Sequence, residues 1–395
     1  MNLQSLLDPE IQKFIIEHQY DDLRLLALKL SSDKNPFGKE ILNQVQGRQK
    51  AKNKIPDWLQ IPNVLFPTGI SIEQSSSEAT AKYKASLFSG KKLIDLSSGL
   101  GVDSFYLSKV FDQVVLVEPN EQLLEIVKHN FQSAGIKNAS FYNNTAEYFI
   151  HHNSPKADLI YIDPSRRSNT NKKLFRLEDC QPNVAELVPE LFLIAPKIVI
   201  KTAPLLDIQA AIATLSAVKK VFVLAQNNEC KEVLYLLEKG FANEPEIETI
   251  NLIKGKKQVF NFLFSQEKQA ISDFSIPLKF LYEPNASVMK SGAFKLIATR
   301  FNIQKLSPNS HLYTSQTLIN DFPGRSFHIQ AVCKYNKKEV HHHLKDKKAN
   351  VTSRNFKDNV SEIVKKTGII QGGDKYLFAT TNTDKKAVII ICNRI

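Results

Sequence analysis

Residues 91–101 read KKLIDLSSGLG, and this stretch decides the fold that we expect for the central part of the chain. Its apolar first half ends in Asp95, which predicts a buried β-strand. Gly99 and Gly101 follow, and they predict a tight turn that brings backbone N–H groups close to a ligand before a helix begins. A strand, a glycine-rich turn and a helix in this order are typical of a cofactor-binding α/β sheet.

The sequence around this stretch alternates between strands and helices. The strand candidates are KKLIDLSS, QVVLVEPN, ASFYNN, ADLIYIDP and KIVIKTA. Between them, residues 121–134 place Leu124, Val127 and Phe131 on one face of a predicted helix. This alternation predicts an α/β fold with a parallel sheet covered by helices. After Val221 the pattern becomes strand-rich, and we expect an antiparallel edge there.

The 395 residues are too many for one ordinary core, so we expect several domains. Leucines at helical spacing predict a helical N-terminal region over residues 1–80. The alternating segment spans residues 81–265, a small α+β linking subdomain spans 266–320, and a small basic α+β domain spans 321–395.

The net charge of +12 indicates a polyanionic partner. Residues 321–395 hold 15 Lys and Arg against 7 Asp and Glu, a net charge of +8. A basic domain attached to another domain is typical of nucleic-acid enzymes. No apolar run is long enough to span a bilayer, the first residues lack a signal peptide, and the four cysteines form no CxxC pair. We therefore expect a cytoplasmic protein that has no membrane contact.

The turn after residue 95 discriminates between two cofactors. A dinucleotide site would have a third glycine, where this chain has Ser104. The pattern Asp-x-x-x-Gly-x-Gly, with Glu118 at the end of the next strand to accept the hydroxyls of a ribose, favours S-adenosylmethionine instead. A purely structural strand–helix turn remains the alternative.

The chain resembles a bacterial family of class I S-adenosylmethionine-dependent methyltransferases that carry a C-terminal THUMP-like domain. Beyond residues 91–101, SIEQSSSEATAKYKA, LYEPNASVMKSGAF and RNFKDNVSEIVKKTGIIQGGDKYLFATT carry the resemblance. It implies a Rossmann-like sheet for residues 81–265, a THUMP-like domain for residues 321–395, and RNA as the partner. The expected cofactor-binding residues are Asp95, Ser97, Gly99, Gly101, Asp103, Glu118, Asn144, Ala146 and Gln74. The segment that holds Gln74 either covers the methionine end of the cofactor or caps the following helix.

The stretch YIDPSRR, residues 161–167, ends the fourth predicted strand beside the first. Asp163 should therefore face the methyl group, where a carboxylate can orient an acceptor and take up its proton. We predict Asp163, Pro164 and Arg166 as catalytic, and Arg167, Lys172 and Lys173 as substrate-binding through phosphate contacts. A hydrated surface loop is the alternative for these cations. Base-amine methyltransferases usually have Asp-Pro-Pro-aromatic here, so this chain departs from that pattern.

These observations together predict a methyltransferase that acts on RNA, either tRNA or rRNA. A methyltransferase of a small molecule or a protein, and an RNA-binding protein without activity, are the alternatives. The three histidines 341–343 suggest a metal, but neighbours on a strand point to opposite faces, so we interpret them as part of a basic surface hairpin and expect no metal site.

Overall fold

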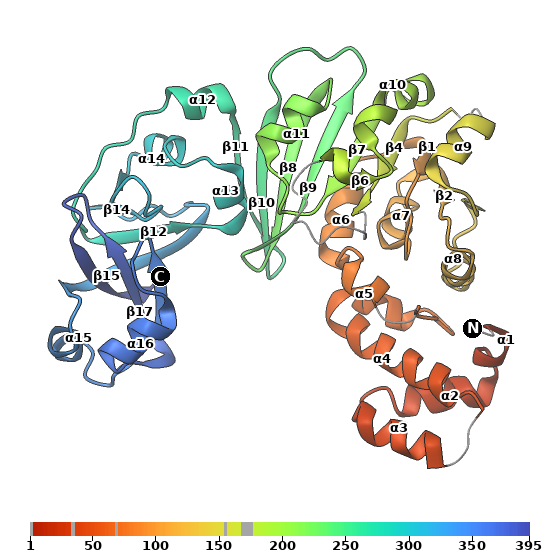
Figure 1. Cartoon of the computed structure of the whole chain (residues 1–395), viewed down its shortest axis with the longest axis horizontal. Coiled ribbons are helices and arrows are strands. Elements are labelled where there is room, and N and C mark those ends of the chain that lie inside the picture. The colour runs from red at the N-terminus through yellow and green to blue at the C-terminus, as the bar shows by residue number, and fades with distance from the viewer. Residues whose placement is uncertain (1–2, 33–35, 68–69, 154–155, 167–176) are drawn as a thin grey trace. The chain divides into compact units, whose positions relative to one another are not determined.

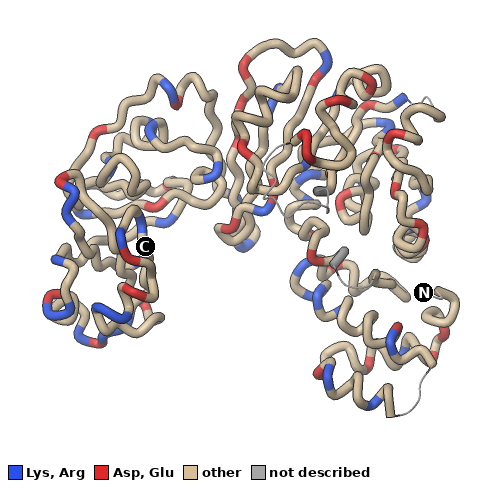
Figure 2. The backbone as a smooth tube through the Cα atoms, in the orientation of Figure 1, with Lys and Arg blue, Asp and Glu red and all other residues tan. Residues whose placement is uncertain are grey.

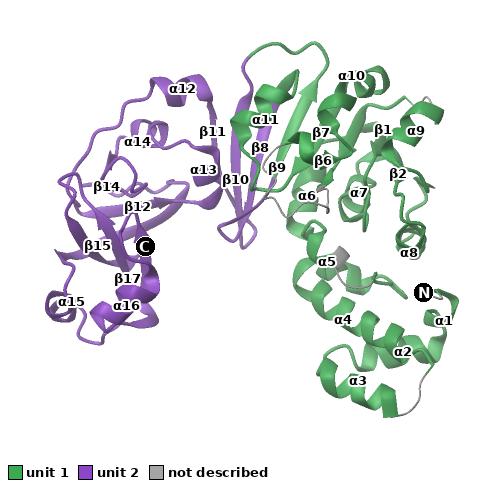
Figure 3. Cartoon of the chain, viewed as in Figure 1, with its two compact units in different colours: residues 1–219, 233–243 green, residues 220–232, 244–395 purple. Residues whose placement is uncertain are grey.

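The computed structural model describes residues 3–32, 36–67, 70–153, 156–166 and 177–395. The chain forms two units (Figures 1 and 3). Unit 1 contains residues 1–219 and 233–243, and unit 2 contains residues 220–232 and 244–395. The chain leaves unit 1 after residue 219 and returns to it for residues 233–243, and both of these changes fall inside strands. From residue 244 on, the chain remains in unit 2.

Unit 1 begins with helices, as the leucine spacing predicts. These are α1 (Leu3–Leu6), α2 (Pro9–Glu17), α3 (Leu23–Ser32), α4 (Gly38–Lys54), the 3-10 helix η1 (Pro56–Gln60), α5 (Ile70–Gln74) and α6 (Glu78–Leu87). The Asp8 side chain caps α2, and Pro9 occupies its first turn. Leucines and isoleucines of α1 to α4 form one apolar core that also contains Ile126 of the following domain. The helical region is therefore packed onto the α/β part of unit 1.

The α/β part of unit 1 follows the predicted alternation. Its elements are β1 (Gly90–Asp95), α7 (Val102–Leu107), β2 (Phe111–Val117), α8 (Glu121–Ser133), β3 (Ala139–Tyr142), α9 (Ala146–Asn153), β4 (Leu159–Ile162), β5 (Ser165–Arg166), η2 (Leu177–Asp179), β6 (Cys180–Gln181), α10 (Val184–Ile194), β7 (Lys197–Thr202) and α11 (Ile208–Thr214). All four side chains of β4 are buried, as expected for a strand covered on both faces.

Within unit 1 the strand order is β9-β7-β4-β1-β2-β3. The pairs β1–β2, β2–β3, β1–β4 and β4–β7 are parallel, and β7 pairs antiparallel with β9 (Glu229–Glu238). From β1 the chain moves outward to β2 and β3 and then returns to β4 on the other side of β1. In open α/β sheets a ligand binds at such a reversal, beyond the carboxyl ends of the two neighbouring strands.

The strand-rich segment after Val221 only partly matches the expected antiparallel edge. In unit 2, β8 (Val218–Gln226) pairs parallel with β10 (Glu246–Ile253), and β10 pairs antiparallel with β11 (Lys256–Leu263). The prediction of an antiparallel edge was therefore wrong for the first of these pairs. The chain passes through β9 between β8 and β10, so it enters β10 in the direction of β8.

The rest of unit 2 is built on a second sheet, with strand order β13-β14-β12-β15-β18-β17-β16. Its elements, with the helix preceding it, are α12 (Phe264–Gln269), β12 (Phe280–Pro284), α13 (Ala286–Ser291), α14 (Leu296–Phe301), β13 (Gln304–Lys305), β14 (Tyr313–Ser315), β15 (Gly324–Lys334), α15 (Lys337–His343), β16 (Lys348–Arg354), α16 (Val360–Thr367), β17 (Ile370–Thr381) and β18 (Ala387–Arg394). Alternate residues face opposite sides: Leu377 belongs to one apolar core and Phe378 to another. Each face of this sheet therefore has its own core.

The three histidines that we placed on a surface hairpin lie on a helix instead. The Asn336 side chain accepts the backbone N–H of Glu339 at 2.9 Å and caps α15, which contains His341, His342 and His343. The strand prediction failed because this capping signal was not recognised. No group of three His, Cys, Asp or Glu side chains positioned to hold a metal occurs among the described residues.

The fold class predicted from the sequence is confirmed. Unit 1 has a Rossmann-like sheet behind a helical N-terminal region, and the chain ends in a small α+β region. Within the described ranges, no helix combines the length and the apolar character needed to cross a bilayer.

Candidate functional site

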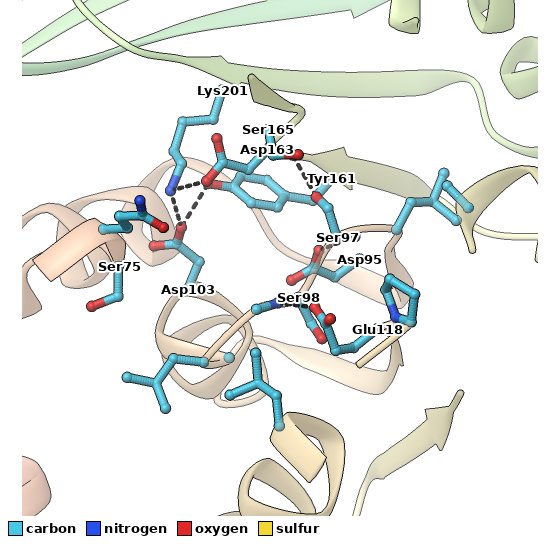
Figure 4. Close-up of a pocket in the computed structure, with 18 of the residues that line it drawn as sticks. Ser75, Asp95, Ser97, Ser98, Asp103, Glu118, Tyr161, Asp163, Ser165 and Lys201 are labelled. Carbon is cyan, nitrogen blue, oxygen red and sulfur yellow. Dashed lines mark hydrogen bonds and ion pairs between the residues drawn. The ribbon is translucent and has the colours of Figure 1, made fainter. Parts of the chain in front are cut away.

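A cavity of about 390 Å³ lies in unit 1, at the carboxyl ends of β1 and β4 where the strand order reverses. This volume is within the usual range for small-molecule sites. Its lining comes from the carboxyl ends of β1, β4 and β7, from the segments after β1, β2, β4 and β6, from the start of α9 and from the segment before α6 (Figure 4). The lining residues are Gln74, Ser75, Ser76, Asp95, Leu96, Ser97, Ser98, Gly99, Leu100, Gly101, Val102, Asp103, Glu118, Pro119, Leu123, Thr145, Ala146, Glu147, Tyr161, Asp163, Ser165, Gln181, Pro182 and Lys201.

The first wall of the cavity is the glycine-rich turn after β1. Gly99 and Gly101 have φ angles of +53° and +74°, a left-handed conformation that side chains disfavour. A Cβ atom on Gly101 would lie 2.9 Å from Val127 Cγ1, so glycine is also needed there for close packing against α8. The turn thereby exposes its backbone to the cavity, as the sequence predicts.

Asp95 is almost completely buried at the base of this turn. Its carboxylate accepts hydrogen bonds from Ser104 Oγ at 2.5 Å and from the backbone N–H of Ser97 at 3.1 Å. Burial raises the pKa of Asp95 to about 7, although both hydrogen bonds act against that rise. The Ser104 hydroxyl and the Ser97 N–H thus hold the Asp95 carboxyl in place at the base of the turn.

Glu118 stands at the end of β2, on the other side of the turn. Its two oxygens accept the backbone N–H groups of Gly99 at 3.0 Å and Asn120 at 2.9 Å. Burial raises the pKa of Glu118, and these two N–H groups counteract the rise. The interactions hold the carboxylate at the cavity wall, where its remaining lone pairs can accept hydroxyl groups.

Ser98 adds a polar atom that the sequence analysis did not single out. Its hydroxyl is buried and has no hydrogen-bond partner among the described residues, although the residue lines the cavity. Buried polar groups are nearly always hydrogen-bonded, so an unpaired hydroxyl at a cavity wall indicates that a ligand completes it. Figure 4 shows Ser98 beside Glu118.

Asp103 lies at the centre of a buried charged cluster at the other end of the cavity. Lys84 Nζ is 2.8 Å from Asp103 Oδ1, and Lys201 Nζ is 3.2 Å from Oδ2. The hydroxyls of Ser76 and Tyr161 donate to Oδ2 at 2.8 and 2.7 Å. Burial alone would raise the pKa of Asp103, but the two ammonium groups hold it well below its usual value.

Lys201 connects this cluster to the predicted catalytic carboxylate. Its ammonium group lies 2.7 Å from Asp163 Oδ2 and also donates to Ser76 Oγ at 3.0 Å (Figure 4). The backbone N–H of Asp163 donates to Ser97 Oγ at 2.6 Å. Asp163 is thus held from both sides, by the turn after β1 and by the end of β7, with about a third of its side chain exposed.

The predicted residues are distributed unevenly over this site. The cavity brings together Asp163 and eight of the predicted cofactor-binding residues: Gln74, Asp95, Ser97, Gly99, Gly101, Asp103, Glu118 and Ala146. Pro164 is buried next to the lining, and Asn144 precedes the lining residue Thr145. The backbone of Arg166 pairs with Cys180 in a short ladder, β5–β6. Arg167, Lys172 and Lys173 lie outside the described residues.

The segment before α6 caps that helix and also lines the cavity. Ser77 caps α6 by accepting the backbone N–H of Thr80 at 3.3 Å, whereas Gln74 and Ser76 line the cavity. Sequence reasoning missed Lys201, Lys84 and Tyr161. A lysine that ends the apolar run of β7 was the available signal for Lys201 (KIVIKTA), because Asp163 follows β4 in the same way.

The sheet, its reversal point and this cavity give unit 1 the fold of a class I methyltransferase domain. In agreement, residues 59–184 match a family described as conserved hypothetical protein 95, residues 280–323 match a ferredoxin-like domain, and residues 324–394 match a family described as THUMP domain-like. Over its whole length the chain is 28% identical to a candidate methyltransferase from Porphyromonas gingivalis W83. That crystal structure gives a TM-score of 0.89 and a match that covers 100% of this chain and 99% of that chain.

Two further solved structures match only part of the chain. An rRNA methylase from Streptococcus thermophilus is 15% identical over 41% of this chain and 94% of that chain, with a TM-score of 0.31. The tRNA (uracil-54, C5)-methyltransferase of Pyrococcus abyssi is 18% identical over 45% of this chain and 40% of that chain, with a TM-score of 0.31. The comparison with curated proteins finds no match. The resemblance seen in the sequence is confirmed: the chain is similar over its whole length to a candidate methyltransferase, and its last residues match a THUMP-like family.

Proposed function

We propose that the protein is an S-adenosylmethionine-dependent methyltransferase that acts on RNA. The observation that carries this proposal is Asp163, which lies at the reversal point of a class I methyltransferase sheet and in the wall of the same cavity as Asp95 and Glu118. When bound, S-adenosylmethionine supplies an electrophilic methyl group to an acceptor atom.

The chemistry of the cavity fits this cofactor. Five carboxylates line it and Lys201 is the one ammonium among the lining residues, so the lining favours a cationic ligand. The unpaired Ser98 hydroxyl and the turn around Gly99 offer polar contacts without a blocking Cβ. Glu118 would hold the ribose hydroxyls, and the turn after β1 would hold the amino-acid part.

Asp163 is the group that we assign to the acceptor. Its Oδ2 is occupied by Lys201, and within the described residues no hydrogen bond reaches Oδ1. Oδ1 can therefore accept an N–H or O–H of the substrate, orient the attacking lone pair and take up the proton that is released. Lys201 restricts the rotation of the carboxylate and stabilises its charge.

RNA as the acceptor is supported by the second half of the chain. Residues 324–394 match a THUMP-like family, and THUMP domains occur in RNA-modifying enzymes. The basic excess of residues 321–395 is suited to phosphate contacts (Figure 2). Residues 321–395 supply β15 to β18 of the second sheet of unit 2, so deleting them would break that sheet. Point variants therefore give the cleaner test.

The test is transfer of labelled methyl groups to total RNA. We expect label in the RNA fraction with the unaltered protein, and no label with Asp163→Ala, which should still bind S-adenosylhomocysteine in calorimetry. Asp95→Ala should weaken that binding instead. Label that appears only in protein or small molecules would contradict the RNA assignment. No heat with either S-adenosylmethionine or its demethylated product would overturn the methyltransferase assignment itself.

A further inference from the structure

A second and larger cavity lies entirely in unit 2 and takes no part in the site described above. Its volume is about 920 Å³. Two hairpin turns contribute to it, Asn227–Asn228 between β8 and β9 and Lys254–Gly255 between β10 and β11, together with the start of β15. We call it the unit 2 cavity; it is lined by Asn227, Asn228, Asn251, Ile253, Lys254, Lys256, Lys257, Gln258, Val259, Asn285, Asn320, Asp321, Phe322, Pro323, Gly324, Arg325 and Arg394.

A network of side-chain amides fixes the walls of the unit 2 cavity. Asn251 is fully buried; its Oδ1 accepts the backbone N–H of Asn228 at 3.0 Å, and its Nδ2 donates to Gln258 Oε1 at 3.1 Å. The same Oε1 accepts Asn285 Nδ2 at 3.2 Å, and Gln258 Nε2 donates to the Gly324 carbonyl at 3.0 Å. The network joins a hairpin turn, β10, β11 and the ends of β12 and β15. The cavity is therefore a built feature with fixed walls.

The charge of the lining is strongly positive. It contains Lys254, Lys256, Lys257, Arg325 and Arg394, and a single carboxylate, Asp321. Arg325 is already paired with the buried Glu283, so four cations remain for a ligand. The three lysines are exposed, and no ion pair involves them among the described residues. Four cations around amide groups are suited to phosphates and to the hydroxyls or base edges between them.

Protection of an edge strand is the simpler explanation for some of these lysines. Lysines on an edge strand such as β11 prevent aggregation. That role does not require a cavity, and it does not account for Arg394 on β18. The convergence of cations from the β10–β11 turn, β11 and β18 onto one amide-lined space indicates a ligand instead.

We propose that the unit 2 cavity binds a segment of the RNA substrate, mainly through its phosphates. This inference rests on the proposed function and adds a contact made by residues 227–259, which lie outside the THUMP-like region. The volume exceeds that of a single phosphate and can hold a nucleotide with its neighbouring phosphates. No exposed aromatic ring lines the cavity, so the contact should show little preference for sequence and a strong dependence on salt.

The experiment measures binding of fluorescently labelled bulk tRNA by anisotropy between 50 and about 300 mM salt, a range over which counterion release is resolved. The test variant is Lys254→Ala/Lys256→Ala/Lys257→Ala. The matched control, Lys91→Ala/Lys128→Ala/Lys137→Ala, removes the same charge from three exposed lysines of unit 1. We expect the test variant to reduce the magnitude of the negative slope of log affinity against log salt by about 2–3. The control should leave this slope within about 0.5 of that of the unaltered protein.

A second variant, Arg394→Ala, tests the opposite wall of the cavity and should lower the slope by about 1. Thermal unfolding followed by circular dichroism verifies that each variant is folded. Equal slopes for the test variant, the control and the unaltered protein would overturn the cavity proposal while methyl transfer to RNA still supports the proposed function. The proposal would also be overturned if calorimetry shows that inorganic phosphate binds the unaltered protein while the test variant loses no affinity for RNA. Failure of the proposed function has a different signature, because the unaltered protein would then transfer no methyl group to RNA.

Discussion

Replacing Asp103 by asparagine should destabilise unit 1 far more than replacing a surface aspartate. The Asp103 carboxylate lies 2.8 Å from Lys84 and 3.2 Å from Lys201, and the Lys84 side chain is completely buried. Asn has the same shape and keeps hydrogen-bonding capacity, so Asp103→Asn removes the charge with little change in packing. Two buried ammonium groups then lose the carboxylate that they share.

The magnitude follows from the distances. At 2.8 Å and an effective dielectric constant of 20, the attraction between unit charges is about 6 kcal/mol. Desolvation offsets part of this energy, and removing one partner of a buried pair typically costs about 3–5 kcal/mol. The double variant Asp103→Asn/Lys84→Met removes both charges of the shorter pair. It should be less destabilised than the sum of the single variants by about 1–3 kcal/mol.

Trp58 makes unit 1 separately measurable. It is the only tryptophan of the chain and is fully buried in unit 1, so its fluorescence in urea reports the unfolding of that unit. Because the pKa of Asp103 is held below its usual value, its stabilising effect is complete above the unfolded-state pKa of about 4, and we specify measurements at pH 7.

The matched control is Asp57→Asn. Asp57 pairs with Lys82 at 2.7 Å, but the two side chains are 55% and 49% exposed, so we expect a cost below about 1 kcal/mol. Similar losses for Asp57→Asn and Asp103→Asn would refute the view that the buried cluster holds this end of the cavity together.

Three further predictions concern the same site. Asp95→Asn should stabilise unit 1 at pH 8 by at most about 4 kcal/mol, because ionising the buried carboxyl costs free energy above its pKa of about 7. The gain in stability should vanish below pH about 4, and a gain independent of pH would contradict this prediction. Gly101→Ala should cost about 2–3 kcal/mol of unfolding free energy and Gly99→Ala only about 1 kcal/mol. Both glycines have positive φ, but only at Gly101 would the added Cβ also collide with a neighbour. Urea unfolding measures both costs, and equal costs would be evidence against the packing role of Gly101. Lys201→Met should lower the turnover of methyl transfer at least tenfold with a smaller change in calorimetric cofactor affinity, since Lys201 contacts Asp163; equal losses would place Lys201 in cofactor binding instead.

The central sheet could be predicted because its signals are local. The run KKLIDLSSGLG contains a strand, two glycines with positive φ and the start of a helix within eleven residues. Asp95, Glu118 and Asp163 each follow a recognisable strand, and parallel strands present their carboxyl ends at one edge. These three carboxylates do line one cavity.

The charged cluster could not be predicted because it depends on strand order. The order β7-β4-β1 brings Lys201, at the end of β7, to Asp103, and the packing of α6 against α7 brings Lys84. In the sequence, Lys84 reads as one of two lysines on an amphipathic helix, and such lysines are usually exposed. The prediction for the histidines 341–343 failed for another reason. A seven-residue helix is too short to show a clear helical period, so it can be recognised only by its cap.

The path of the chain through β8 and β9 has a consequence for how the protein folds during synthesis. Residues 220–232 belong to unit 2 but are made before residues 233–243, which complete unit 1. The part of β9 that belongs to unit 1 and pairs with β7 therefore leaves the ribosome only after β8, the first strand of the other unit. Neither unit can be moved into another protein as one continuous segment, since any single cut of the chain deprives one of the two units of a strand.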